Sequence, residues 1–209
     1  MTVATAQQPQ LQQTHADAAT RAGGWLFKRR TVIPLPLALA VLLIPAPATR
    51  NQLLVVAGMV LVALGETIRL WGVRHIGAIS RTRSTRLGPL VASGPFSLVR
   101  NPLYIGNIAL WVGFALTARL AWLAPIFFAV LAFEYHAIVR WEERLLHERL
   151  GDRYRAYVEQ VPRWIPATRH AVANPSANVF SWRETIYSER GTLIAIAIGF
   201  ALLWFKSGL

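Results

Sequence analysis

Long apolar stretches separated by arginine-rich polar segments dominate the pattern along this chain. Five stretches have the composition expected of helices in a bilayer. They are Val32–Pro47, Leu53–Trp71, Leu103–Ala118, Ala121–Arg140 and Leu193–Phe205. A full crossing takes about 20 apolar residues, so the first, third and fifth stretches are short. The pattern predicts an all-α polytopic membrane protein with about five transmembrane helices.

Short and polar connections complete the predicted organisation. The third and fourth stretches are joined so tightly that they must form an antiparallel helical hairpin. Ser181 and Glu184 have the spacing of a capping box, which predicts a short helix leading into the last stretch. We expect a disordered cytoplasmic tail, a membrane core, a polar linker with a short helix, and a C-terminal transmembrane helix. These segments cover residues 1–30, 31–166, 167–190 and 191–209.

Composition narrows the chemistry. The chain has 209 residues, of which 54% are hydrophobic and 15% charged, whereas a soluble domain has about 25% charged residues. The chain contains no cysteine, which excludes a disulfide scaffold, a cysteine nucleophile and a thiolate metal site. Its five histidines show no metal-ligand spacing, so no metal site is expected.

Positive charge is distributed unevenly along the chain. The 22 Lys and Arg residues outnumber the 10 Asp and Glu residues. They flank the apolar stretches and form no continuous stripe, so nucleic acid is not an expected partner. Eighteen of them precede the first stretch or lie in the two long loops, and three lie on the other side. The positive-inside rule therefore places the N-terminus, both long loops and any chemistry in them in the cytoplasm, and the C-terminus outside.

A first motif precedes the third stretch. Residues 94–106 read GPFSLVRNPLYIG. Asn101 is a favoured N-cap and Pro102 suits the first helical position, so a helix begins here with its positive end beside Arg100. An anion such as a carboxylate would bind favourably there. Gly106 and Gly113 share one face, where a ligand or a helix can approach closely. Simple helix initiation with small-residue packing remains the alternative.

A second motif follows the fourth stretch. Glu142 and Glu143 point about 100° apart on a helix, so at most one can face a ligand squarely. The other can pair with a nearby basic residue of its own helix. The basic residues that we consider are Arg140, Arg144 and His147. The alternative is a solvated interfacial turn. Gly151 indicates a helix end, and the prolines that follow it predict an extended segment able to close over a site.

Ionisable residues also occur inside the apolar stretches. Glu66 and Arg69 are three residues apart, so an intramembrane pair and a functional role are both open. Glu134 and His136 lie in the fourth stretch, where ionisable groups are functional candidates by default. Pairing toward the bundle interior is the alternative for both.

Together, the two motifs resemble the isoprenylcysteine carboxyl methyltransferase family, within a wider group that includes the phospholipid N-methyltransferases. The resemblance rests on G-P-F-S-x-V-R-N-P-x-Y-x-G, E-E-x-x-L and L-G-x-x-Y-x-x-Y-x-x-x-V-P-R-x-I-P, in that order. It covers about Gly65–Pro166. It implies a membrane enzyme that transfers a methyl group from S-adenosyl-L-methionine bound in a cytoplasmic-side pocket.

The resemblance also implies roles for individual residues. The cofactor-binding candidates are Arg100, Asn101, Pro102, Tyr104, Gly106, Glu142, Glu143, Tyr154, Tyr157 and Ile165. The catalytic candidates are Arg100, Arg163, Glu142 and Glu143. The chain departs from the family prototypes at Asn101, where they have histidine. Asparagine can still cap a helix, but it cannot act as an acid or base near neutral pH.

The acceptor is expected to be a lipophilic small molecule or lipidated group that enters from the bilayer, with membrane lipid as the other partner. Carboxyl O-methylation of an isoprenylcysteine-like or other lipophilic acid is the first hypothesis. Arg100 and Arg163 would hold the acid. The alternatives are a phospholipid amine N-methyltransferase, a membrane NADPH-dependent reductase of the sterol-reductase type, and a non-enzymatic membrane protein with a degenerate pocket. We expect the protein in a bacterial inner membrane with its active site in the cytoplasm.

Overall fold

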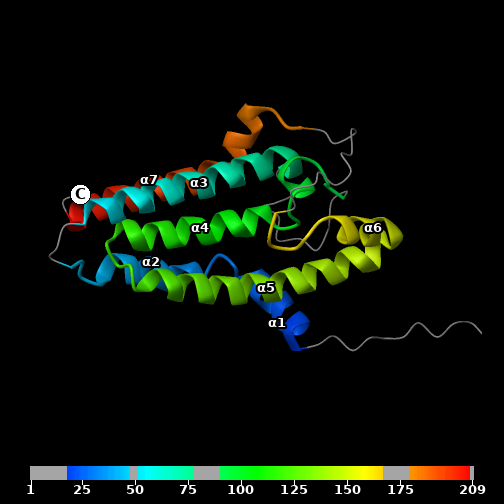
Figure 1. The fold of residues 1–209 in the computed structure, drawn as a ribbon, viewed down its shortest axis with the longest axis horizontal. Helices are drawn as coiled ribbons and strands as arrows, with labels where there is room; N and C mark the ends of the chain where they lie inside the picture. Colours follow the sequence, from blue (N-terminus) through cyan, green and yellow to red (C-terminus); the bar gives the residue numbers. More distant parts are fainter. Residues whose placement is uncertain (1–17, 48–50, 78–89, 167–178, 208–209) are drawn as a thin grey trace, which may run out of the picture.

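A computed structural model describes residues 18–47, 51–77, 90–166 and 179–207, and the regular secondary structure in these ranges is helical, with no strand (Figure 1). The α-helices are α1 (Ala18–Arg29), α2 (Pro34–Leu43), α3 (Gln52–Ile76), α4 (Pro102–Thr117), α5 (Leu123–Leu150), α6 (Asp152–Gln160) and α7 (Trp182–Ser207). A short 3-10 helix, η2 (Gly94–Ser97), precedes α4. The all-α prediction is confirmed for the described part of the chain.

Three of these helices are long and apolar enough to cross a membrane, namely α3, α5 and α7. Helices α2 and α4 are apolar but shorter, with 10 and 16 residues. Each of the five predicted apolar stretches therefore contributes a helix. The prediction of five complete crossings stays a prediction, because the lengths of α2 and α4 do not establish it.

Helices α3 and α4 lie antiparallel and very close along a seam of glycines. A Cβ atom added to Gly65 would lie 2.7 Å from the carbonyl oxygen of Gly106, and one added to Gly113 would lie 2.8 Å from that of Gly58. The two glycines of α3 are seven residues apart, and so are the two of α4, so each helix presents both of its glycines on one face. The seam leaves no room for a side chain and sets the spacing between the two backbones.

Helix α5 completes the central bundle by folding back from α4 (Figure 1). The link spans only residues 118–122 between the two helices, which confirms the predicted hairpin. Inward-facing side chains of α5, including Phe127, Leu131 and Ile138, are almost fully buried in the main apolar core. Gly151 ends α5 with a φ of 53°, as the sequence predicts.

Helix α1 packs across α5 and corrects one prediction. A Cβ atom at Gly23 would lie 2.0 Å from the carbonyl oxygen of Ala137, and the rings of Phe27 and Trp141 lie 4.9 Å apart. The prediction of a disordered tail over residues 1–30 is therefore wrong for residues 18–29. Residues 1–17 lie outside the described residues.

Helix α7 lies along α3 and includes the predicted capping box (Figure 1). The backbone N–H of Ser181 donates to Glu184 over 2.8 Å, and the backbone N–H of Glu184 donates to the Ser181 hydroxyl over 3.3 Å. The helix then runs unbroken into the apolar stretch, where a short helix was predicted to lead into a separate one. At its far end Lys206 donates to the carbonyl oxygens of Val41 and Ile44, which ties α7 to the end of α2.

Candidate active site

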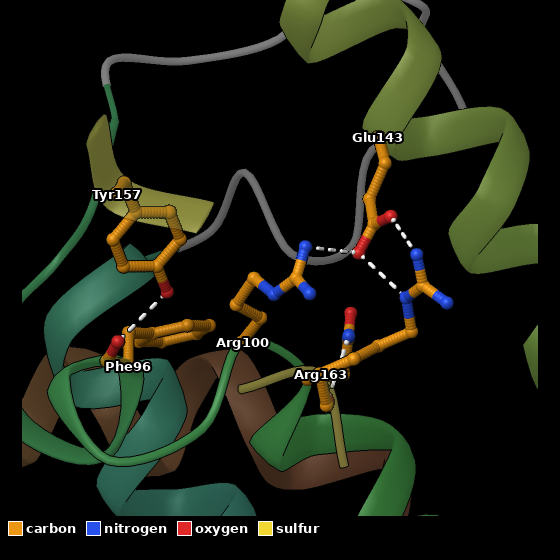
Figure 2. Close-up of polar contacts among 6 residues, drawn as sticks. Phe96, Arg100, Glu143, Tyr157 and Arg163 are labelled. Atoms are coloured by element: carbon orange, nitrogen blue, oxygen red, sulfur yellow. Dashed lines mark hydrogen bonds and ion pairs between the residues drawn. The ribbon is translucent and has the colours of Figure 1, made fainter. Parts of the chain in front are cut away.

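The two sequence motifs meet at the end of the bundle where α4 begins. Arg100 and Asn101 precede α4, Glu143 lies on α5, and Arg163 lies on the segment that follows α6. Figure 2 shows the guanidinium groups of Arg100 and Arg163 on either side of the Glu143 carboxylate. Residues as distant in the sequence as Asn101 and Arg163, which are 62 positions apart, thus form one cluster.

Glu143 holds this cluster together. Arg100 donates Nη1 to its Oε1 over 2.8 Å. Arg163 donates Nε to Oε1 over 3.0 Å and Nη2 to Oε2 over 2.7 Å. The Glu143 and Arg100 side chains are only 11% and 10% exposed, so both charges are largely desolvated. Hydrogen bonding to Glu143 raises the pKa of Arg163 above its usual value. The expected pairing of a glutamate with Arg140, Arg144 or His147 is therefore wrong for Glu143, which pairs with Arg100 and Arg163.

The Arg100, Glu143 and Arg163 side chains carry two positive charges and one negative charge. The excess positive charge lies next to the start of α4, where the helix dipole is also positive. A buried cluster of this kind favours an anionic group at the ends of the guanidiniums that Glu143 does not occupy. The geometry thus supports the predicted anion preference of this region.

Asn101 occupies the N-cap position of α4, but its side chain makes no cap hydrogen bond. Its Nδ2 instead donates to the carbonyl oxygen of Arg163 over 3.1 Å. The capping role predicted for the Asn101 side chain is therefore wrong. The backbone carbonyl of Asn101 still accepts from Ile105, so only the side chain is diverted, and it fixes the segment after α6.

The segment that follows α6 is attached to the site at several points. The N–H of Arg100 donates to the carbonyl of Pro162 over 2.9 Å. The hydroxyl of Tyr157 donates to the carbonyl of Phe96 over 2.7 Å (Figure 2), and Tyr154 hydrogen-bonds Arg100. Burial raises the pKa values of both tyrosines, which therefore stay neutral hydroxyls at physiological pH. The predicted covering segment lies against the start of α4.

A second contact joins the motifs deeper in the bundle. The Tyr104 hydroxyl on α4 lies 3.1 Å from both carboxylate oxygens of Glu142 on α5. The Tyr104 ring stacks on Tyr135, with centroids 4.6 Å apart. The positive charge of Arg30, which follows α1, interacts electrostatically with Tyr104, Tyr135 and Glu142. Glu142 and Glu143 thus point to different partners, as their helical spacing requires.

Three of the predicted site residues have other surroundings. Ile165 is 79% exposed and contributes nothing to the cluster. Pro102 is buried in the first turn of α4. Gly106 faces α3, where the backbone of Gly65 and the side-chain stem of Arg69 cover it. Gly106 therefore lies in a close helix–helix contact, as the alternative of small-residue packing predicts.

Polar residues inside the bundle extend the picture beyond the motifs. Glu66 lies 3.5 Å from Arg69, which confirms their proximity. Arg69 also pairs with Glu189 of α7 at 2.7 Å and donates to Asn107. The sequence analysis did not identify Arg30, Asn107, Tyr135 or Glu189 as site residues. The sequence offers one indication of such a role, which is that Asn107 and Glu189 are polar residues in or next to apolar stretches. Glu134 is 3% exposed, and its carboxylate has no hydrogen-bond partner among residues 18–47, 51–77, 90–166 and 179–207.

These surroundings fit S-adenosyl-L-methionine in chemical character. The excess positive charge around Glu143 suits the carboxylate of its methionyl part. The stacked rings of Tyr104 and Tyr135, with the Glu142 carboxylate beside them, suit a sulfonium cation. Within the described ranges, no group of three or more His, Asp or Glu residues is arranged to hold a metal ion.

Residues 53–153 match the phospholipid methyltransferase family. The matched region contains α3, α4 and α5 with both glutamates and the first motif. It excludes α1, α7 and the segment that carries Arg163. The match confirms the resemblance at the level of the wider membrane methyltransferase group.

Two curated relatives share about half of the chain. The cobalt-zinc-cadmium resistance protein CzcN of Cupriavidus metallidurans is 36% identical over 117 residues, which are 56% of this chain and 50% of that protein. The nickel-cobalt-cadmium resistance protein NccN of Alcaligenes xylosoxydans xylosoxydans is 32% identical over 113 residues, or 54% and 50% of the two chains. The chain thus spans about half the length of these relatives. No solved structure matches it.

Proposed function

We propose that this chain, whose residues 53–153 match the phospholipid methyltransferase family, is an integral membrane methyltransferase that uses S-adenosyl-L-methionine and acts on a lipophilic acceptor. One observation carries the proposal. Arg100, Glu143 and Arg163 join both sequence motifs and the covering segment in one cluster of excess positive charge, in which Arg100 and Glu143 are largely desolvated. The two guanidiniums share a single carboxylate, so one positive charge remains for an anionic ligand.

The residues divide the task between them. Arg100 and Arg163 hold an anionic group, and Glu143 fixes both guanidiniums in orientation. Asn101 holds the covering segment through the Arg163 carbonyl. Tyr104 and Glu142 lie deeper, where they orient the reacting end of the cofactor. When bound, S-adenosyl-L-methionine supplies an activated methyl group, so the protein contributes mainly orientation and exclusion of water.

We propose a lipophilic carboxylic acid of isoprenylcysteine-like character as the acceptor. A carboxylate is anionic at pH 7 and needs no base, and the cluster offers cations to align it. The surfaces of α3, α5 and α7 expose large apolar side chains such as Leu64, Phe133 and Ile194, as expected of helices that face lipid. Such an acceptor would reach the site from the bilayer.

A phospholipid amine is the second candidate, and Glu142 is the observation that favours it. Its carboxylate contacts the Tyr104 hydroxyl and is separate from the Arg100–Glu143–Arg163 cluster. An amine must lose a proton before or during attack on the methyl carbon. Glu142 would then accept that proton as a general base.

The deciding experiment uses the full chain purified in lipid nanodiscs. Calorimetric titration with S-adenosylhomocysteine tests cofactor binding, and NADPH is titrated in parallel because a reductase would bind it. Methyl-labelled S-adenosylmethionine is then supplied with N-acetyl-S-farnesylcysteine or with phosphatidylethanolamine. Base-labile label on the first acceptor supports carboxyl methylation, whereas base-stable label on the lipid supports amine methylation. Binding of NADPH alone, or of neither ligand, would overturn the proposed function.

A further inference from the structure

Helix α7 lies outside the region that matches the methyltransferase family, yet it places a carboxylate inside the bundle. Glu189 is 1% exposed and accepts a hydrogen bond from Arg69 of α3 over 2.7 Å. Thr192, one turn further along α7, contacts the same Arg69 nitrogen at 3.3 Å. A buried carboxylate is costly unless it is paired, and an ionisable residue inside a membrane helix is a functional candidate.

The contacts of Arg69 lead from α7 toward the candidate site. Arg69 uses Nη2 for Glu189 and Nη1 for the Oδ1 atom of Asn107 on α4. With its oxygen engaged, the amide of Asn107 presents its N–H groups, and it hydrogen-bonds Tyr135 of α5. The ring of Tyr135 stacks on Tyr104, whose hydroxyl contacts both oxygens of Glu142.

Each contact in this series has a defined direction. The guanidinium can donate to Glu189 and to Asn107 at the same time only while its plane lies between them. The aliphatic part of the Arg69 side chain lies against Gly106, where an added Cβ atom would be 2.6 Å from Arg69 Cγ. The orientation of Arg69 therefore decides which amide atom Asn107 turns toward Tyr135. A change at Glu189 would reach Tyr104 through this sequence of contacts.

We propose that Glu189 of α7 is a positioning residue for the cofactor site: through Arg69 and Asn107 it fixes the Tyr135–Tyr104 stack and so the Tyr104–Glu142 contact. The inference rests on the proposed function, because it assigns cofactor binding to that contact. It also gives α7 a role in the site, although α7 lies outside the family match.

The test measures S-adenosylhomocysteine affinity by calorimetry for the full chain in nanodiscs. The variants are Glu189→Gln, Tyr135→Phe and the double variant. Each single variant is expected to weaken binding about five- to tenfold, as for a lost hydrogen bond to an oriented polar group. The double variant should bind no more weakly than either single one, because both changes act through the same contact.

Two controls separate positioning from packing. Leu203→Ala removes a buried side chain of α7 that is 1% exposed, away from Glu189. Glu148→Gln removes an exposed carboxylate of α5. Both controls should bind like the wild type, although Leu203→Ala should melt at a lower temperature.

Several results would overturn the inference. They are wild-type affinity in Glu189→Gln, multiplying losses in the double variant, or an equal loss in Leu203→Ala. If Glu189→Gln does not fold, wild-type affinity in Tyr135→Phe is sufficient to reject it. Failure of the wild type to bind S-adenosylhomocysteine would instead reject the proposed function, and the inference with it.

Discussion

Arg163 and Glu143 form a bidentate ion pair, with Nε 3.0 Å from Oε1 and Nη2 2.7 Å from Oε2. The pair fastens the segment after α6 to the end of α5, and Arg100 shares the same carboxylate. Planar two-point pairing of this kind fixes both side chains in direction as well as in distance. This carboxylate supplies the ionic part of the attachment, beside the hydrogen bonds from Arg100 and Asn101 to the backbone of the segment.

Replacing Glu143 with glutamine should loosen that segment, because only its two backbone hydrogen bonds to Arg100 and Asn101 remain. The variant leaves the buried Arg100 guanidinium and the partly exposed Arg163 guanidinium without their anion. We therefore expect a loss of about 3 kcal/mol in stability, as for a broken buried pair. S-adenosylhomocysteine binding should weaken as well. Thermal unfolding and calorimetric titration measure the two effects. Glu148→Gln is the matched control, because its ion pair with Arg144 is largely exposed; equal losses in both variants would contradict the prediction.

The effect of an Asn101 substitution on cofactor binding should depend on whether the new side chain can donate a hydrogen bond, and not on whether it can cap a helix. Asn101→Leu and Asn101→Asp both lose the donor to the Arg163 carbonyl, although aspartate is a good N-cap. Each should cost about 1 kcal/mol of cofactor binding. Asn101→His keeps an N–H donor and should be tolerated. Cofactor titration of the three variants decides, and wild-type binding by Asn101→Asp would favour capping instead.

Enlarging the glycine seam should reduce stability. Gly65→Ala places a methyl group 2.7 Å from the Gly106 carbonyl and 3.0 Å from the Leu110 nitrogen. Overpacking of this kind costs about 1–3 kcal/mol. Ala57→Val enlarges an exposed position of α3 and should have little effect. The measurement is the unfolding temperature in detergent, and an unchanged temperature for Gly65→Ala would show that the helices separate freely.

Glu142→Gln should distinguish the two acceptor classes. If Glu142 orients the cofactor, the variant binds S-adenosylhomocysteine more weakly, by about tenfold for one lost charge-assisted contact. Tyr104→Phe should then give a similar loss. Kinetics with the acceptor found in nanodiscs complete the test. Unchanged cofactor affinity with a collapsed turnover and a lost pH dependence would identify a general base, and the amine acceptor would replace the acid.

The orientation of the protein can be tested at its last residue. The C-terminal end of α7 lies at the end of the bundle opposite α6 and the start of α4 (Figure 1). Because arginine-rich segments surround the site end, that end should be cytoplasmic and residue 209 outside. Fusion of alkaline phosphatase and of a fluorescent protein at residue 209 reports the side. Fluorescence without phosphatase activity would place both ends in the cytoplasm.

The apolar helices could be predicted because each continuous hydrophobic run specifies its own helix. Their ends agree to within a few residues where glycine or proline marks them, as at Gly151 and Pro102. Helix α1 was missed because its sequence carries several basic residues and buries only a narrow face, including Gly23 and Phe27. Local composition indicates disorder there, and packing on α5 decides otherwise.

The site could be predicted as a set of residues but not as a set of contacts. Family resemblance brought Arg100, Glu143 and Arg163 forward, yet nothing local indicates that one carboxylate serves both arginines. Those partners lie 43 and 20 residues from Glu143. The role of Asn101 was misassigned for the same reason, since its partner is 62 residues away. Contacts across such separations depend on the tertiary fold.

The glycine seam also restricts how this protein can change through evolution. Glycine is already the smallest residue, so a larger residue at position 65 cannot be compensated by a smaller one at position 106. The same holds for positions 58 and 113. Second-site suppressors of a seam substitution must therefore displace a whole helix. Such a displacement would carry Tyr104 with α4 or Arg69 with α3, so suppressors that restore stability should appear with altered cofactor affinity.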